Sequence, residues 1–143
     1  MTDWAAALEA TSLAAGLRQS VWVYPLVNAG HILGIALLVG CVIPMDMALL
    51  RRGAIAPYAG LRRYAVAGFL LAAVCGALMF VVQARDYLQS PWFAAKIALV
   101  GLAALNAALH LAPGKARTPR LAATASLLLW IAALVCGRMI GYR

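Results

Sequence analysis

The side chains best suited to chemistry lie inside long apolar stretches, where a polar group needs a partner. Residues 20–50 form the first such stretch and contain Asn28, His31 and Asp46. On a helix these three residues fall within about 60° of one another. Because polar side chains inside hydrocarbon usually face a bundle interior, we predict that all three point inward. Asp46 could pair with Arg51, Asn106 or His110, and a helix-end ion pair is favoured over a proton entry site.

His31 is the strongest candidate for a ligand. A neutral imidazole in a bundle core can bind haem iron or copper, relay protons, or hydrogen-bond to another helix. His110 is the other histidine, but at about 1.5 Å per residue the two rings are expected at different depths. Met79 is expected near the depth of His31 and is a second candidate axial ligand. Two alternatives are a haem with His31 as its only protein ligand and a haem that lies between subunits.

Four further polar residues complete the candidate cofactor-binding set. Lys96 and Arg138 are expected near the outer ends of the third and fourth apolar stretches. They could pair with haem propionates or other anions, or reach lipid head groups. Asn106 shares an arc of about 80° with Lys96 and His110 on one helix, and Asn28 precedes His31 by one turn.

Copper is an alternative cofactor, because cysteine and methionine sulfur atoms are ligands that Cu(I) prefers. The candidate pairs are expected at three different depths and do not converge on one site. The odd number of cysteines predicts packing residues rather than disulfides. The pairs are Cys41 with Met45, Cys75 with Met79, and Cys136 with Met139.

The composition indicates an integral membrane protein. Of 143 residues, 66% are apolar and 11% are charged, and the mean hydropathy is +0.91. The net charge of +8 does not predict nucleic-acid binding, since the basic residues cluster at the ends of apolar stretches. The sequence contains no phosphate-binding loop, Cys-x-x-C pair, nucleophile elbow or zinc-protease motif. An electron carrier or accessory subunit is therefore favoured over a stand-alone enzyme.

We predict an all-α, four-helix membrane bundle as one domain over residues 1–143. A surface helix over residues 2–18 precedes four spans at residues 21–50, 64–84, 93–112 and 121–138. Pro44 is expected to kink or end the first span, and residues 85–91 to form a turn. Pro91 is expected to begin the third helix.

The basic loops predict the orientation in the membrane. The segments after the first and third spans carry most of the arginines and lysines, so both termini are expected on the periplasmic side of a bacterial inner membrane. No secretory signal is evident, and the protein is expected to insert through its own spans. Because so little of the chain lies outside the bilayer, we expect a homo-oligomer or a larger membrane complex.

The sequence resembles an uncharacterised family of small bacterial four-span membrane proteins. The resemblance rests on residues 24–27, 31–34, 37–40, 91–93, 126–130 and 137–140, together with Lys96, Asn106 and His110. It implies the four-helix architecture and directs attention to His31, Lys96, Asn106, His110 and Arg138. More remotely, the bundle is similar to membrane b-type cytochromes and to the copper-resistance D membrane family.

The leading hypothesis is a small haem b protein or redox subunit that carries electrons in or across the membrane. His31 would be an axial ligand, with His110 or Met79 as the possible second. Two alternatives remain. One is a copper or small-solute transport component. The other is a structural subunit without a cofactor, in which Gly30, Gly34 and the small residues of the second span make helix contacts.

Overall fold

The computed structural model confirms the all-α, four-helix architecture. It describes residues 3–52, 58, 60–111 and 119–142, and these form seven helices without any strand. The helices, in chain order, are α1 (Asp3–Glu9), α2 (Ser12–Gln19), α3 (Val23–Arg52), α4 (Leu61–Val82), α5 (Ala84–Gln89), α6 (Pro91–Leu111) and α7 (Pro119–Met139).

Four of these helices, α3, α4, α6 and α7, are long and apolar enough to cross a bilayer, so the chain is a multi-pass membrane protein. Their ends lie within three residues of the predicted spans. Large apolar side chains on all four helices point away from the bundle, as lipid-facing side chains do. Examples are Leu33, Leu70, Leu102 and Leu128, which are all more than half exposed.

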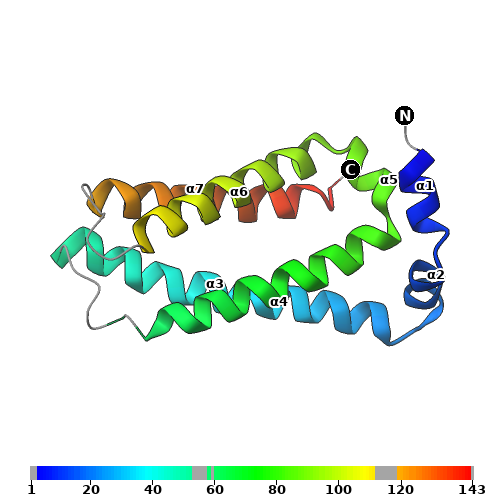
Figure 1. Ribbon diagram of the computed structural model, residues 1–143, viewed down its shortest axis with the longest axis horizontal. Helices are drawn as coiled ribbons and strands as arrows, with labels where there is room; N and C mark the ends of the chain where they lie inside the picture. The colour runs from blue at the N-terminus through cyan, green and yellow to red at the C-terminus, as the bar shows by residue number, and fades with distance from the viewer. Residues whose placement is uncertain (1–2, 53–57, 59, 112–118, 143) are drawn as a thin grey trace.

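The bundle consists of two helix pairs (Figure 1). Helix α3 packs along α4, α6 packs along α7, and contacts between α3 and α7 join the two pairs. Among the described residues, α4 and α6 make no comparable contact with each other. The ring of helices is thus closed on three sides and loosely packed on the fourth.

The α3–α4 pair is held by a close backbone approach at two glycines. A Cβ built on Gly34 would lie 2.5 Å from the backbone nitrogen of Ala72, and one built on Gly68 would lie 2.6 Å from that of Leu38. Only glycine fits at such a crossing, which is how small residues bring membrane helices together. The predicted packing role of Gly34 and of the small residues in the second span is therefore realised within one chain.

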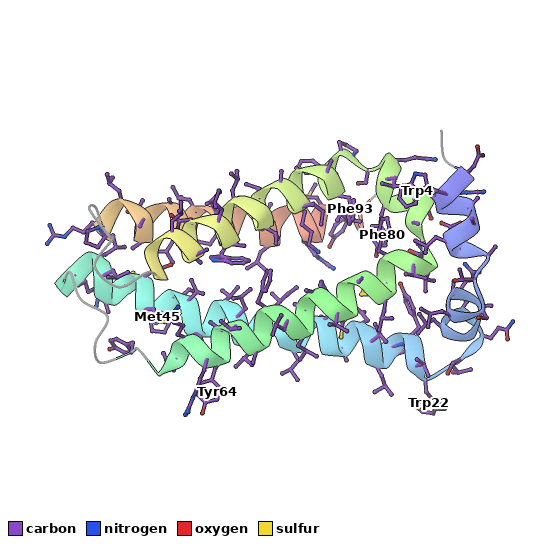
Figure 2. All side chains as sticks on the ribbon, in the orientation of Figure 1. Trp4, Trp22, Met45, Tyr64, Phe80 and Phe93 are labelled. Carbon is purple, nitrogen blue, oxygen red and sulfur yellow. The ribbon has the colours of Figure 1, made fainter. Side chains whose placement is uncertain are left out.

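An aromatic cluster closes the end of the bundle where both chain termini lie (Figures 1 and 2). The Phe80 ring stacks on Phe93 with 5.5 Å between centroids, and Tyr87 lies 5.1 Å from Phe93. Trp4 of α1 lies 6.4 Å from Phe80. These rings join α1, α4, α5 and α6 at the level where α4 and α6 are otherwise apart.

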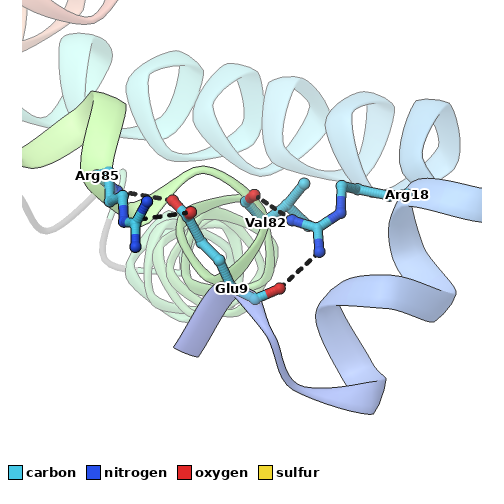
Figure 3. A network of polar contacts seen from close by, with 4 residues as sticks. All are labelled: Glu9, Arg18, Val82 and Arg85. Atoms are coloured by element: carbon cyan, nitrogen blue, oxygen red, sulfur yellow. Dashed lines mark hydrogen bonds and ion pairs between the residues drawn. The ribbon is translucent and has the colours of Figure 1, made fainter. Parts of the chain in front are cut away.

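Polar contacts attach α1 and α2 to the same end (Figure 3). Arg18 donates to the carbonyl oxygen of Val82 at 3.1 Å and to that of Glu9 at 2.5 Å. The Glu9 carboxylate accepts from the backbone N–H of Arg85 at 2.8 Å and lies 3.9 Å from its guanidinium. A free carbonyl at the end of α4 and a free N–H at the start of α5 are thereby satisfied.

Two local predictions were wrong. The N-terminal segment forms two helices instead of one, because the Thr11 hydroxyl caps α2 by accepting from the Ala14 N–H at 3.3 Å. Residues 84–89 form the short helix α5 rather than a turn. Of the two outcomes predicted for Pro44, the end of the helix is not seen, because α3 continues to Arg52. Pro91 begins α6 as predicted.

Candidate functional site

His31 faces α4 and is anchored by a hydrogen bond. Its Nδ1 lies 2.7 Å from the carbonyl oxygen of Ala72, and the residue is half-buried. A carbonyl oxygen can only accept, so Nδ1 must carry the proton in this bond. In the neutral ring Nε2 then keeps a free lone pair, which is the arrangement common to histidine ligands of metals.

A glycine makes room for the imidazole. A Cβ built on Gly76 would lie 3.1 Å from Cε1 of His31 and 3.3 Å from Nδ1. The ring therefore rests directly on the backbone of α4, one turn beyond Ala72. This contact and the hydrogen bond together fix the orientation of the ring.

Lys96 is the second predicted residue that the fold brings to this level. It is half-buried on α6, and its side chain packs along Gly137 of α7. A Cβ built on Gly137 would lie 3.6 Å from Cδ, Cε and Nζ of Lys96. Its positive charge acts on the ring of His31. An imidazole from α3 and an ammonium from α6 therefore lie within range of each other inside the bundle.

The two candidate second ligands lie at different distances from this level. His110 follows Lys96 by 14 residues on α6, which is about 21 Å along the helix axis. Its side chain lies outside the described part of the structure. Met79 follows Gly76 by one turn of α4 and is half-buried. Along the helices, Met79 is thus nearer to the level of His31 than His110 is.

The other three predicted residues do not join His31. Asn28 is exposed, although it shares its helical direction with Asp46. Arg138 is exposed and donates to the Tyr142 hydroxyl at 2.8 Å, with its guanidinium over that ring. Asn106 donates to the carbonyl oxygen of Ala122 at 3.0 Å and thereby links α6 to α7.

Asp46 lies in the opposite half of the bundle, beside a cavity of about 290 Å³. Side chains from α3, α4, α6 and α7 line this cavity. The lining includes Asn106 and Ser126 but neither His31 nor Lys96. The predicted ion pair with Arg51 is absent. Among the described side chains, no lysine or arginine nitrogen lies within 4.0 Å of the Asp46 carboxylate.

The three cysteines are buried and unpaired, as expected for packing residues. Cys75 lies against Gly30, where a built Cβ would meet its sulfur atom at 3.0 Å. Within the described ranges, no three His, Cys, Asp or Glu side chains gather in one place.

Several residues that shape the site could not be singled out from the sequence. The carbonyl of Ala72 carries no signal, because every residue has one. Gly76 and Gly137 are visible in the sequence as glycines. The side chains that lie against them, His31 and Lys96, come from other helices, and no local pattern predicts those contacts.

Comparison of the chain with protein-family models, curated proteins and solved structures gives no match.

Proposed function

We propose that this chain is a small membrane redox protein that binds haem b through His31. The observation that carries the proposal is the 2.7 Å contact between Nδ1 of His31 and the Ala72 carbonyl oxygen. It holds the tautomer in which Nε2 is free to bind iron, and the protein provides a low-dielectric environment around it. The haem iron would supply one-electron transfer.

The roles of the surrounding residues follow from their positions. The Lys96 ammonium is suited to pair with a propionate, since a carboxylate at this depth needs a cation. Gly76 sets the distance of the ring from α4. Met79 is the candidate for the second axial position; a ligand from a second copy of the chain would serve equally.

The test is a visible absorption spectrum of the purified protein, before and after reduction with dithionite. The proposal predicts a Soret band that sharpens on reduction, with separate α and β bands. His31→Ala should abolish the spectrum, whereas His110→Ala should keep it. Met79→Leu should shift the bands if Met79 is the second ligand.

A structural role for His31 is distinguished by chemical rescue. In His31→Gly, added imidazole should restore the bands if the ring acts as a ligand, because a free imidazole can occupy the same space. A colourless wild-type protein from haem-replete cells, or His31→Ala protein with an unchanged spectrum, would exclude haem binding at this position.

A further inference from the structure

The cavity beside Asp46 is lined by a carboxyl group of which one oxygen has no hydrogen-bond partner. Asp46 is only 8% exposed, and its Oδ2 has no hydrogen-bond partner. The hydroxyl of Ser126 on α7 lies beside the same carboxyl group and interacts with it. Burying a carboxylate without a counter-charge is costly, so this arrangement favours a ligand that carries a positive charge.

Arg62 also lines the cavity but does not supply that charge. Its side chain is exposed at the first turn of α4, and no ion pair within 4.0 Å joins it to Asp46. The carboxyl group of Asp46 therefore lines the cavity without a cation partner among the described residues.

The rest of the wall indicates what kind of cation fits. Phe69 and Trp130 both line the cavity. Their rings pack edge to face, with 6.2 Å between the ring centroids and 72° between the ring planes. Aromatic rings attract cations, and ammonium groups on apolar bodies are the usual partners. Most other lining residues are Ala, Leu, Val and Met, including Met45 on α3 (Figure 2). A hard metal ion prefers six or more oxygen ligands, which this apolar wall does not offer.

We propose that this cavity binds a monovalent organic ammonium ion with an apolar body. Asp46 pairs with the positive charge, the Ser126 hydroxyl orients the carboxylate, and the Phe69–Trp130 pair contacts the ligand. Helices α4 and α6 both line the cavity but pack loosely on each other, so an amphiphilic ligand can enter between them from the bilayer. His31 lies 15 residues from Asp46, about 22 Å along α3, so this site is separate from the haem site proposed above.

The experiment compares two probes of the same shape on the full chain in nanodiscs of phosphatidylglycerol, a lipid without an amine. Phenyltrimethylammonium carries the positive charge, and tert-butylbenzene replaces its nitrogen with carbon. Saturable binding of the cation, at least about tenfold tighter than that of the neutral probe, is expected, since only the cation is attracted by the Asp46 carboxylate and by the faces of the aromatic rings. Equal affinity for the two probes would overturn the proposal, and so would the absence of saturable cation binding.

The residue is assigned by a matched pair of variants. Asp46→Asn keeps the shape of the side chain but removes its negative charge, and should weaken cation binding about 10- to 100-fold. Asp86→Asn removes a carboxylate from α5 at the other end of the bundle and should bind as the wild type does. His31→Ala should also bind the cation normally, which separates this proposal from haem binding. Unchanged affinity in folded Asp46→Asn protein would refute the assignment.

Two sources could supply the ammonium group, a free amine or a lipid headgroup. Adding phosphatidylethanolamine to the nanodiscs distinguishes them. If phosphatidylethanolamine competes with phenyltrimethylammonium, and Asp46→Asn abolishes this competition, the site is supported and its ligand is the lipid headgroup. Cation binding that is unaffected by this lipid supports the site with a free amine as its ligand. If Asp46→Asn protein does not fold, the comparison of the two probes on the wild type still decides.

Discussion

At the residue scale, the glycines of this protein differ in what surrounds them. A Cβ on Gly34 would meet the backbone of α4 at 2.5 Å, and backbone atoms cannot move aside as a flexible side chain can. Gly40, six residues later on the same helix, has nothing within 4 Å of its built Cβ. Replacing each glycine with alanine therefore separates the effect of helix packing on stability from the effect of helix propensity.

Gly34→Ala should lower the stability of the bundle by about 1–3 kcal/mol, because overpacking forces α3 and α4 apart. Gly40→Ala should be neutral or slightly stabilising, since alanine favours the helix. Thermal unfolding in one detergent measures both variants. If Gly34→Ala were as stable as Gly40→Ala, the close approach of the two helices would be disproved.

At the element scale, α1 and α2 are attached to the bundle by few contacts. Arg18 satisfies the Val82 carbonyl at the end of α4, and Glu9 satisfies the Arg85 N–H at the start of α5. Hydrogen bonds to charged groups contribute about 1.5–3 kcal/mol when they are shielded from water, and less here because Arg85 is half exposed.

Arg18→Ala should release the N-terminal helices while leaving the four spans in place. Amide exchange over residues 3–19 and 83–90 should become about tenfold faster, because a tenfold change corresponds to about 1.4 kcal/mol. Arg63→Ala removes an exposed arginine whose described contacts are with its neighbour Tyr64, and serves as the control. Equal exchange in both variants would show that the Arg18 contacts do not hold these helices.

The aromatic cluster gives the same end of the bundle a pH dependence. Burial, with smaller contributions from Tyr24 and Asp86, raises the pKa of Tyr87 above its usual 10.0. The folded state thus favours the neutral phenol. The contribution of Tyr87 to stability is therefore complete below pH 10 and is lost as the pH rises through and above that value.

Tyr87→Phe should therefore lose less stability than the wild type between about pH 9 and pH 11, because it has no phenol to ionise. The unfolding temperature in detergent across this range is the measurement. Tyr142→Phe removes an exposed phenol at the same end and should behave as the wild type does. If the unfolding temperatures of the wild type and of Tyr87→Phe fell equally as the pH rose, the effect would be contradicted.

At the scale of the whole molecule, four spans place both termini at one end (Figure 1). The opposite end carries Arg51, Arg62, Arg63 and Arg120 in the described helices. We infer from the positive-inside rule that this basic end is cytoplasmic and the termini periplasmic.

Alkaline phosphatase fused after residue 143 should then be active in a bacterial host, whereas green fluorescent protein at the same position should be dark. Both fusions placed in the segment between α6 and α7 should give the reverse result. Active phosphatase at the α6–α7 segment together with a fluorescent C-terminal fusion would invert the orientation.

The sequence alone determined the number of spans, their approximate ends and the helical class. These properties are local, because hydropathy and the thickness of the bilayer set the length of each span. The packing of small residues on α4 was also predictable, since glycine and alanine recur on one side of that helix. The two-helix N-terminus was missed because a single threonine cap decided it.

Only the tertiary structure decided which polar residues meet. Asn28 and Asp46 share one direction on α3, yet Asn28 is exposed and Asp46 is buried beside α7, because a neighbouring helix covers that direction at one depth and not at the other. His31 is bound to a backbone carbonyl, a group that no sequence pattern marks. Lys96 packs along Gly137 of α7 near the level of His31, although the three residues belong to different helices. Such pairings depend on the depth and spacing of helices far apart in the chain, which local periodicity does not contain.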